Sequence, residues 1–265
     1  MAKNMIKKQW HKSYGFKLFA ICFWFLVWEG LSIWFASDIL LPSPFSVVKT
    51  LIYLMITLDF WQTILFSSLR IIMGFLLALM TGVLLALISY RNRFVKELFM
   101  PLMKTIQAMP VASFIILALV WIQSKNLSVL ASFLMVMPII YSNILQGFLS
   151  TDQKLLQMAT VFRINQRKQI LAIFIPSVMP YLISAISVGV GFCWKAGIAA
   201  EVIGIPTGSI GRRLHEAELN LMMDELFAWT MVIILISILF EKVVLLLLSP
   251  LHKDVVKSKE DVMKE

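Results

Sequence analysis

The residues of this sequence that could do chemistry are few and scattered. The three histidines, His11, His215 and His252, lie far apart, and no H-E-x-x-H pattern occurs, so the sequence predicts neither a haem site nor a zinc protease site. Both cysteines, Cys22 and Cys193, lie inside apolar runs, which favours buried side chains over a disulfide or a metal site. No cluster of nucleophiles, bases or metal ligands indicates an enzyme.

Phosphate-binding patterns are equally scarce. The sequence contains no G-x-x-x-x-G-K-[ST], so the chain lacks the loop with which ATPases hold phosphate groups. The stretch "GIPTGSIG" (204–211) offers only a lone glycine pattern, and we expect a loop or short helix there because no strand precedes it. We therefore expect this chain to bind no nucleotide, no other cofactor and no metal.

Charged residues inside the long apolar runs are few, and Glu29, Arg70 and Lys195 stand out among them. A charge at the middle of a bilayer costs about 2.5–3.5 kcal/mol on insertion scales, so such residues are candidates for a transport path. For Lys195 two interpretations stay open, because it either lines the path or extends its ammonium to the nearby membrane surface. The candidate path residues are Lys195, Glu201 and Glu29, with Glu201 and Lys195 on different faces of one helix.

The composition is that of a membrane protein. Hydrophobic residues make up 60% of the 265 positions and charged residues 15%, and the mean hydropathy is +0.86, which is outside the usual range of soluble domains. The net charge of +9 does not indicate nucleic-acid binding, because the basic residues lie in short gaps between apolar runs. We predict an integral protein of the cell membrane that contacts lipid and no nucleic acid.

The predicted fold is all-α with six transmembrane helices, since a bilayer core of about 30 Å needs about 20 apolar residues per helix. The predicted spans are 16–36, 64–89, 99–122, 127–148, 176–199 and 226–248. The first is interpreted as a retained span, because no A-x-A-like cleavage site follows it. The corresponding domains are an N-terminal tail (1–15), a transmembrane domain (16–249) and a C-terminal tail (250–265).

Positive charges predict the orientation, because Lys and Arg in short loops resist translocation. Basic residues gather in four regions that share one side of a six-span chain: Lys3, Lys7, Lys8, Lys12 and Lys17; Arg91, Arg93 and Lys96; Lys154, Arg163, Arg167 and Lys168; Lys253, Lys257, Lys259 and Lys264. The opposite loops are poorer in positive charge and contain Asp38 and Asp59. Both termini are therefore predicted to be cytoplasmic, in a multi-pass protein of the bacterial plasma membrane.

Two predicted spans carry small residues at every fourth position. These are Gly74, Ala78, Gly82 and Ala86 in the second span, and Ala185, Gly189, Cys193 and Gly197 in the fifth. A bare helix face lets another backbone approach closely, which drives helix association in lipid. Chance enrichment is the alternative, because small residues are common in such spans.

The third predicted span is weaker than the others. Pro101, Lys104, Gln107 and Pro110 crowd its first half. A broken helix sheltered beside a water-filled path is one interpretation, because freed backbone groups need partners away from lipid. A span that simply starts later is the other.

The fourth gap, between the predicted spans 127–148 and 176–199, is expected to contain a short amphipathic helix. Leu155, Met158, Ala159 and Phe162 fall at i, i+3, i+4 and i+7, with Thr151 and Asp152 as candidate caps. Such a helix either lies on the membrane surface or offers its apolar stripe to a groove on a cytoplasmic partner.

The same stretch resembles the signature of importer permeases of the ATP-binding-cassette class: Glu-Ala-Ala, three residues, Gly, nine residues, Ile, one residue, Leu-Pro. In this sequence it begins at Gln157, Met158 and Ala159, has Arg163 at the glycine and Ile173 at the isoleucine, and ends on Ile175-Pro176. "PSPFSVVKTL" (42–51), "LMKTIQAMPVASFIILALVW" (102–121) and "GFCWKAGIAAEVIG" (191–204) are similar to the nitrate, sulfonate and taurine branch. The resemblance extends over nearly the whole chain.

The resemblance implies an importer in which two permease chains, expected to be a homodimer, pair with two cytoplasmic ATPase subunits that bind the ATP. An external binding protein or lipoprotein would deliver a small anionic or heterocyclic solute. The resemblance places six residues in the helix that couples to the ATPase, between spans four and five: Leu155, Gln157, Met158, Ala159, Phe162 and Arg163. Since glycine permits backbone angles that arginine disfavours, Arg163 is expected to disfavour the turn after this helix.

The alternative function is a secondary transporter driven by an ion gradient. It predicts carboxylates inside the membrane for proton or sodium coupling, and Glu29 is the clear candidate for one. Internal repeats between the two halves, which many such transporters have, are not evident.

Overall fold

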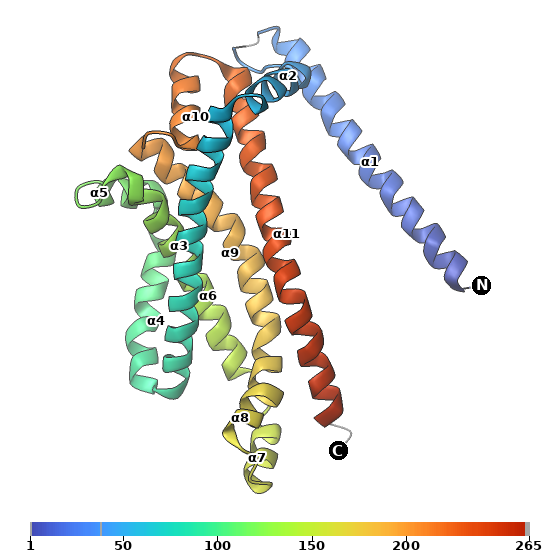
Figure 1. Ribbon diagram of the computed structural model, residues 1–265, viewed down its shortest axis with the longest axis vertical. Coiled ribbons are helices and arrows are strands. Elements are labelled where there is room, and N and C mark those ends of the chain that lie inside the picture. The colour runs from blue at the N-terminus through green and yellow to red at the C-terminus, as the bar shows by residue number, and fades with distance from the viewer. Residues whose placement is uncertain (1, 38, 263–265) are drawn as a thin grey trace. The chain divides into compact units, whose positions relative to one another are not determined.

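The structure, a computed structural model, describes the backbone of residues 2–37 and 39–262, and the side chains of residues 16, 19, 20, 22–37 and 39–248. The predicted tails 1–15 and 250–265 and Asp38 lie outside the described side chains. All elements in the described ranges are helices, and these residues contain no strand (Figure 1). The predicted all-α fold is confirmed.

The chain divides into two compact units, Met1–Trp61 with Arg213–Met231, and Gln62–Arg212 with Val232–Glu265. We call them the N-terminal unit and the core unit. The N-terminal unit holds α1 (Ala2–Phe35), α2 (Pro44–Met55), the first turn of α3 (Leu58–Arg91), most of α10 (Ile210–Leu219) and the start of α11 (Met223–Val262). The core unit holds the rest of α3 and α11, the first turn of α10, α4 (Arg93–Ala108), α5 (Val111–Ala118), α6 (Ser124–Leu149), α7 (Gln153–Val161), α8 (Gln166–Gln169), the π-helix η1 (Ile170–Phe174) and α9 (Ile175–Gly204).

Among the described residues, four helical segments are long and apolar enough to cross a membrane. They are Leu58–Arg91, Ser124–Leu149, Gln166–Gly204 and Met223–Leu248, and the bent pair of α4 and α5 makes a fifth if it is counted as one span. The four segments correspond to the second, fourth, fifth and sixth predicted spans, and the bent pair corresponds to the third. The apolar part of α1, Cys22–Phe35, is shorter than a span, so the number six stays a prediction.

The third predicted span is a broken helix. α4 and α5 meet at an angle of 100°. The break falls at Met109 and Pro110, where the backbone is extended because proline disfavours the helical conformation of the residue before it. α4 itself begins at Arg93. The alternative that the membrane span starts later than residue 99 stays a prediction, because a helix start does not fix where the bilayer begins. One face of α5 is sheltered, because its Ile115 and Ala118 pack in one apolar cluster with residues of α6 and α9.

The small residues of α3 and α9 lie where helices of the core unit touch. A Cβ added to Gly74 would lie 2.5 Å from the Val129 carbonyl oxygen, and one added to Gly197 would lie 2.6 Å from Ile71 Cγ1. Added at the two other stripe glycines, Gly82 and Gly189, it would lie 2.9 Å from Ile140 Cβ and 3.1 Å from Val136 Cγ1. The four non-glycine members of the stripes, Ala78, Ala86, Ala185 and Cys193, are fully buried. α3, α6 and α9 therefore form a closely packed group of helices.

Candidate functional site

The predicted helix of the fourth gap is present as α7. Its first turn is capped by Asp152, whose carboxylate accepts a hydrogen bond from the Lys154 backbone N–H at 2.8 Å. The other candidate cap, Thr151, instead donates to the Gly147 carbonyl oxygen of the preceding helix. Figure 1 shows α7 and α8 at the end of the core unit where α3 turns into α4, so the basic residues of the second and fourth gaps share one end.

The turn that follows α7 forms in spite of Arg163. Arg163 has a φ of 50°, in the left-handed region. Its N–H donates to the Thr160 carbonyl at 3.1 Å, and the Ile164 N–H donates to the Ala159 carbonyl at 2.9 Å, which together make a Schellman motif. The left-handed conformation of arginine costs about 1–2 kcal/mol, so the expected unfavourable effect is present. The two hydrogen bonds compensate for it, and the turn forms.

α7 exposes apolar side chains. Within the predicted stripe, Ala159 is fully buried and Leu155 is half-buried, whereas Met158 is exposed and Phe162 is 73% exposed. Val161, which the period-based stripe does not include, is 77% exposed. We call Met158, Val161 and Phe162 the α7 patch. An exposed apolar patch on a polar, basic segment suits either a protein partner or the membrane surface, so both interpretations of this helix stay open.

A buried carboxylate joins three elements at the opposite end of α9. Glu201 is 0% exposed, and its Oε2 accepts hydrogen bonds from the Ser67 hydroxyl of α3 at 2.7 Å and from the Gly211 N–H at 3.2 Å. Ser67 Oγ in turn accepts from the Ile210 N–H at 2.9 Å. Ser128 of α6 lies beside the carboxylate, while Glu201 Oε1 has no hydrogen-bond partner among the described residues. We call Ser67, Glu201 and the α10 N-terminus the Glu201 network.

The backbone around the Glu201 network is tightly constrained. A side chain at Gly211 would collide with Glu201 and would lie 2.5 Å from the Val202 nitrogen, so α10 begins in backbone contact with α9. Ile205, which ends α9, has a φ of 47°, an outlier for a β-branched residue. Its N–H donates to the Glu201 carbonyl at 2.8 Å. In this structure Glu201 therefore faces packed protein, not an open path.

Lys195 lies on a different face of α9 from Glu201, as predicted. Its side chain is exposed, and its Nζ lies 5.8 Å from the centre of the Phe192 ring. Gly191, one turn away, has open space around it, since a Cβ added there would meet no atom within 4 Å. This stretch of α9 is thus open within the chain, and the structure fits both interpretations of Lys195.

A carboxylate in the apolar part of α11 was not among the residues predicted from the sequence. Glu241 of α11 accepts a hydrogen bond from the Ser187 hydroxyl of α9. It lies within the apolar segment Met223–Leu248, where its charge is costly. Glu29 is therefore not the only candidate for a carboxylate inside the membrane. Hydropathy averaged over a window hides Glu241, because its neighbours on both sides are apolar. The two adjacent charges in "FEKVV" (240–244) could have identified it.

Glu29 belongs to the N-terminal unit and not to the core unit. It lies on α1 and lines a shallow hollow of 500 Å³ with residues of α2, among them Pro44, Phe45 and Val48. Every other residue lining that hollow is apolar apart from Cys22. Among the residues that the structure describes, no group of three or more His, Cys, Asp or Glu side chains is arranged to hold a metal ion.

Comparison with known proteins gives a consistent result. Residues 74–256 match a family described as "Binding-protein-dependent transport system inner membrane component". Over 252 residues, 93% of this chain and 90% of the relative, the sequence is 23% identical to the putative aliphatic sulfonates transport permease protein SsuC of Bacillus subtilis. It is 26% identical over 202 residues, 72% of each chain, to the nitrate import permease protein NrtB of Synechococcus elongatus. The bicarbonate transport system permease protein CmpB of the same species is 26% identical over 171 residues, 64% of this chain and 61% of the relative.

Proposed function

The chain belongs to the family of binding-protein-dependent transport system inner membrane components, and from this premise we propose that it forms the translocation path of an ATP-driven importer. It is a multi-pass transport protein of the cell membrane and not an enzyme. In this proposal the chain binds no cofactor itself, because ATP is bound and hydrolysed by separate ATPase subunits.

The observation that carries the proposal is the α7 patch. Met158, Val161 and Phe162 expose apolar surface at the tip of the core unit, on a helix whose two ends are fixed by the Asp152 cap and the Schellman motif at Arg163. A rigid helix with two or three apolar anchors is suited to a groove on another protein. In the proposal this groove belongs to a cytoplasmic ATPase subunit. When the ATPase subunits close, α7 moves with the groove and passes the movement on to α8, η1 and α9.

The distribution of positive charge supports a cytoplasmic position for α7. The α3–α4 turn lies at the same end of the core unit as α7 and α8 (Figure 1). That turn contains Arg91 and Arg93, and the segment from the end of α7 through α8 contains Arg163, Arg167 and Lys168. Basic residues in short loops stay on the cytoplasmic side. We therefore keep the arrangement of six spans with both termini in the cytoplasm, with the apolar part of α1 as the first of them.

The proposed path runs beside α9. Lys195 and Gly191 leave an open, partly polar strip on a mostly apolar helix, and a second permease chain, as a homodimer, would enclose it. Lys195 supplies a positive charge, which suits a small anionic solute, and the names of the relatives refer to sulfonates, nitrate and bicarbonate. Glu201 and Glu29 stay candidates from the sequence, although packed protein encloses Glu201 in this structure. An external binding protein would set which solute arrives.

The experiment is copurification of ATPase activity with the tagged full-length chain from its native membrane. Met158→Glu places a charge in the α7 patch and should remove the copurifying activity, because a single desolvated charge costs more than about 1 kcal/mol of association. The matched control is Phe94→Glu, which makes the same change at an exposed apolar residue of the other basic loop. Equal activity with both variants would remove the assignment of α7.

The path is tested separately by Lys195→Met, which keeps the apolar stem and removes the ammonium. A large loss of uptake with normal copurification of the ATPase supports a position in the path. Unchanged uptake and apparent affinity would favour an ammonium that only reaches the membrane surface.

A further inference from the structure

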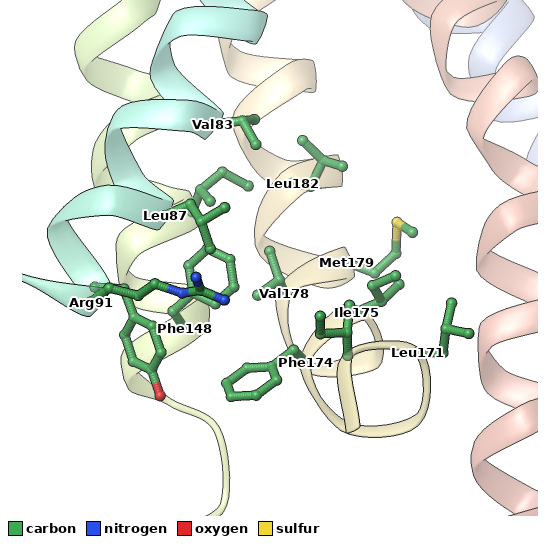
Figure 2. Close-up of a pocket in the computed structure, with 13 residues that line it drawn as sticks. Val83, Leu87, Arg91, Phe148, Leu171, Phe174, Ile175, Val178, Met179 and Leu182 are labelled. Atoms are coloured by element: carbon green, nitrogen blue, oxygen red, sulfur yellow. The ribbon is translucent and has the colours of Figure 1, made fainter. Parts of the chain in front are cut away.

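The core unit contains a large apolar cavity that the proposed transport function does not use. It has a volume of 730 Å³, within the range of about 300–1,000 Å³ typical of small-molecule sites. Its walls come from α3, α6, η1 and α9, at the α7 end of the unit (Figure 2). Apolar side chains form most of it, including Val83, Leu87, Phe148, Phe174, Val178 and Leu182.

One charged residue lines this cavity. Arg91, the last residue of α3, extends its guanidinium group from the helix toward the cavity, and in the view of Figure 2 it lies between Leu87 and Phe174. It makes no ion pair with any described residue, unlike its neighbour Arg93, which pairs with Glu97 at 3.9 Å. A cation that borders apolar walls and has no described counter-ion is suited to an anion that carries an apolar tail.

The depth of the cavity fits such a ligand. Val83 lies eight residues before Arg91 on the same helix, so the apolar part extends about 12 Å along the helix axis from the charge. Tyr90, whose ring stacks on Phe148 at a centroid distance of 5.2 Å, precedes Arg91 in the sequence and lines the same cavity. Tyrosine is enriched where a membrane protein crosses from lipid to water, which places Arg91 at the level of lipid headgroups.

The wall formed by η1 is unusual in its backbone. The Ile175 N–H donates to the Ile170 carbonyl, a π-type bond, just before Pro176, whose nitrogen has no hydrogen to donate. This wider turn directs Leu171 and Phe174 to the cavity. Single π-turns inside α-helices are frequent at functional sites.

We propose that this cavity binds one anionic phospholipid of the cytoplasmic leaflet, with an acyl chain between α3 and α9 and its phosphate on Arg91. The inference goes beyond the proposed transport function, since it concerns how the bilayer holds the end of α9 that follows α7. It relies on that function only for the assignment of the leaflet. Free phosphate alone would not use the apolar walls, so the apolar lining selects a lipid.

The test is native mass spectrometry of the purified full-length chain with equal amounts of phosphatidylglycerol and phosphatidylcholine of identical acyl chains. We expect phosphatidylglycerol to be retained preferentially. Arg91→Gln should lower its occupancy about fivefold relative to phosphatidylcholine, because one basic residue near the headgroups contributes about that factor. The matched control, Arg93→Gln, removes the same charge from a side chain that is 92% exposed and should change nothing.

A second pair of variants tests the apolar part. Val178→Trp fills the cavity and should displace both lipids, whereas Val188→Trp adds the same group at an exposed position of α9 that does not line it. Equal effects of Arg91→Gln and Arg93→Gln would overturn the proposal, as would displacement of the lipid by inorganic phosphate. Lipid bound to the monomer but absent from a dimer would overturn it too, by assigning the cavity to the contact between two copies.

Discussion

The two ends of α9 are built in opposite ways. At one end, the Glu201 network joins α9 to α3 and α10 by buried hydrogen bonds, and Gly211 lets two backbones touch. At the other end, α9 continues through η1 and α8 to α7, whose patch is exposed. Buried polar networks with most members satisfied fix one arrangement, whereas an exposed apolar patch is free for a partner.

The difference between the two ends of α9 indicates which end is expected to move. A signal that enters at α7 meets a segment with exposed side chains and a π-turn, and then a helix held at its far end by the Glu201 network. A rigid far end turns displacement of α7 into rotation or bending of α9 as one element, as in hinge motions of packed helices. The same reasoning predicts that substitutions at the two ends affect different quantities.

The largest effect is expected at Glu201. Glu201→Ala removes two hydrogen bonds to a carboxylate and leaves Ser67 Oγ and the Gly211 N–H buried without it, which should lower the free energy of unfolding by about 3 kcal/mol. Thermal unfolding of the full chain in detergent measures the change. The matched substitution Glu97→Ala, at an exposed residue of α4, should have almost no effect. Similar losses for both variants would show that the Glu201 network does not hold this end.

The next effect compares two glycines of α9. Gly197→Ala brings a methyl group to 2.6 Å from Ile71 Cγ1 and 2.7 Å from Ser132 Oγ, and we expect about 2 kcal/mol of destabilisation from overpacking. Gly191→Ala has open space around it and should be neutral or stabilising by up to about 1 kcal/mol, since alanine favours helices. The same unfolding assay ranks the pair, and the reverse order would contradict the close packing of α9 on α3. A loss of uptake with Gly191→Ala in a stable chain would support a path beside this residue.

A smaller effect of the opposite sign is expected at Arg163. Arg163→Gly relieves the left-handed conformation and should stabilise the α7 turn by about 1 kcal/mol. Slower amide hydrogen exchange at Ile164 and Phe162 would report it. Arg167→Gly is the control, because Arg167 lies in α8 with a right-handed helical backbone, where glycine should destabilise. Faster exchange in both variants would mean that the turn at Arg163 is not strained.

The smallest effect on stability is expected in the α7 patch. Val161→Ser should change the free energy of unfolding by less than about 0.5 kcal/mol, because the side chain is 77% exposed. It should nevertheless reduce the ATPase activity that copurifies with the chain. If Val161→Ser unfolds readily, or keeps full ATPase binding, the α7 end does not differ from the Glu201 end in the way predicted.

The sequence was sufficient for the features that the bilayer imposes. The length of a membrane crossing predicts helices near 127–148 and 176–199, and the structure has Ser124–Leu149 and Ile175–Gly204. The break in the third span was foreseeable from Pro110, because its effect on Met109 is local. The small residues at every fourth position likewise mark the contact faces of α3 and α9.

The remaining features depend on contacts between distant residues. Ser67 and Glu201 are separated by 134 positions, so nothing local indicates that they share a hydrogen bond. α10 begins where that carboxylate accepts a backbone N–H, and this contact too joins separate elements. At Arg163 a propensity argument was misleading, because the two Schellman hydrogen bonds outweigh the preference of arginine for other backbone angles. Six spans, the cytoplasmic position of both termini and the pathway residues stay predictions.

The most direct test of the central claim concerns the source of energy. The full chain is reconstituted into vesicles with the ATPase that copurifies with it, and accumulation of labelled sulfonate, nitrate and bicarbonate is measured with a binding protein outside. Uptake that requires ATP hydrolysis and disappears with Met158→Glu is the predicted result. Accumulation by the chain alone under a proton or sodium gradient would contradict the account.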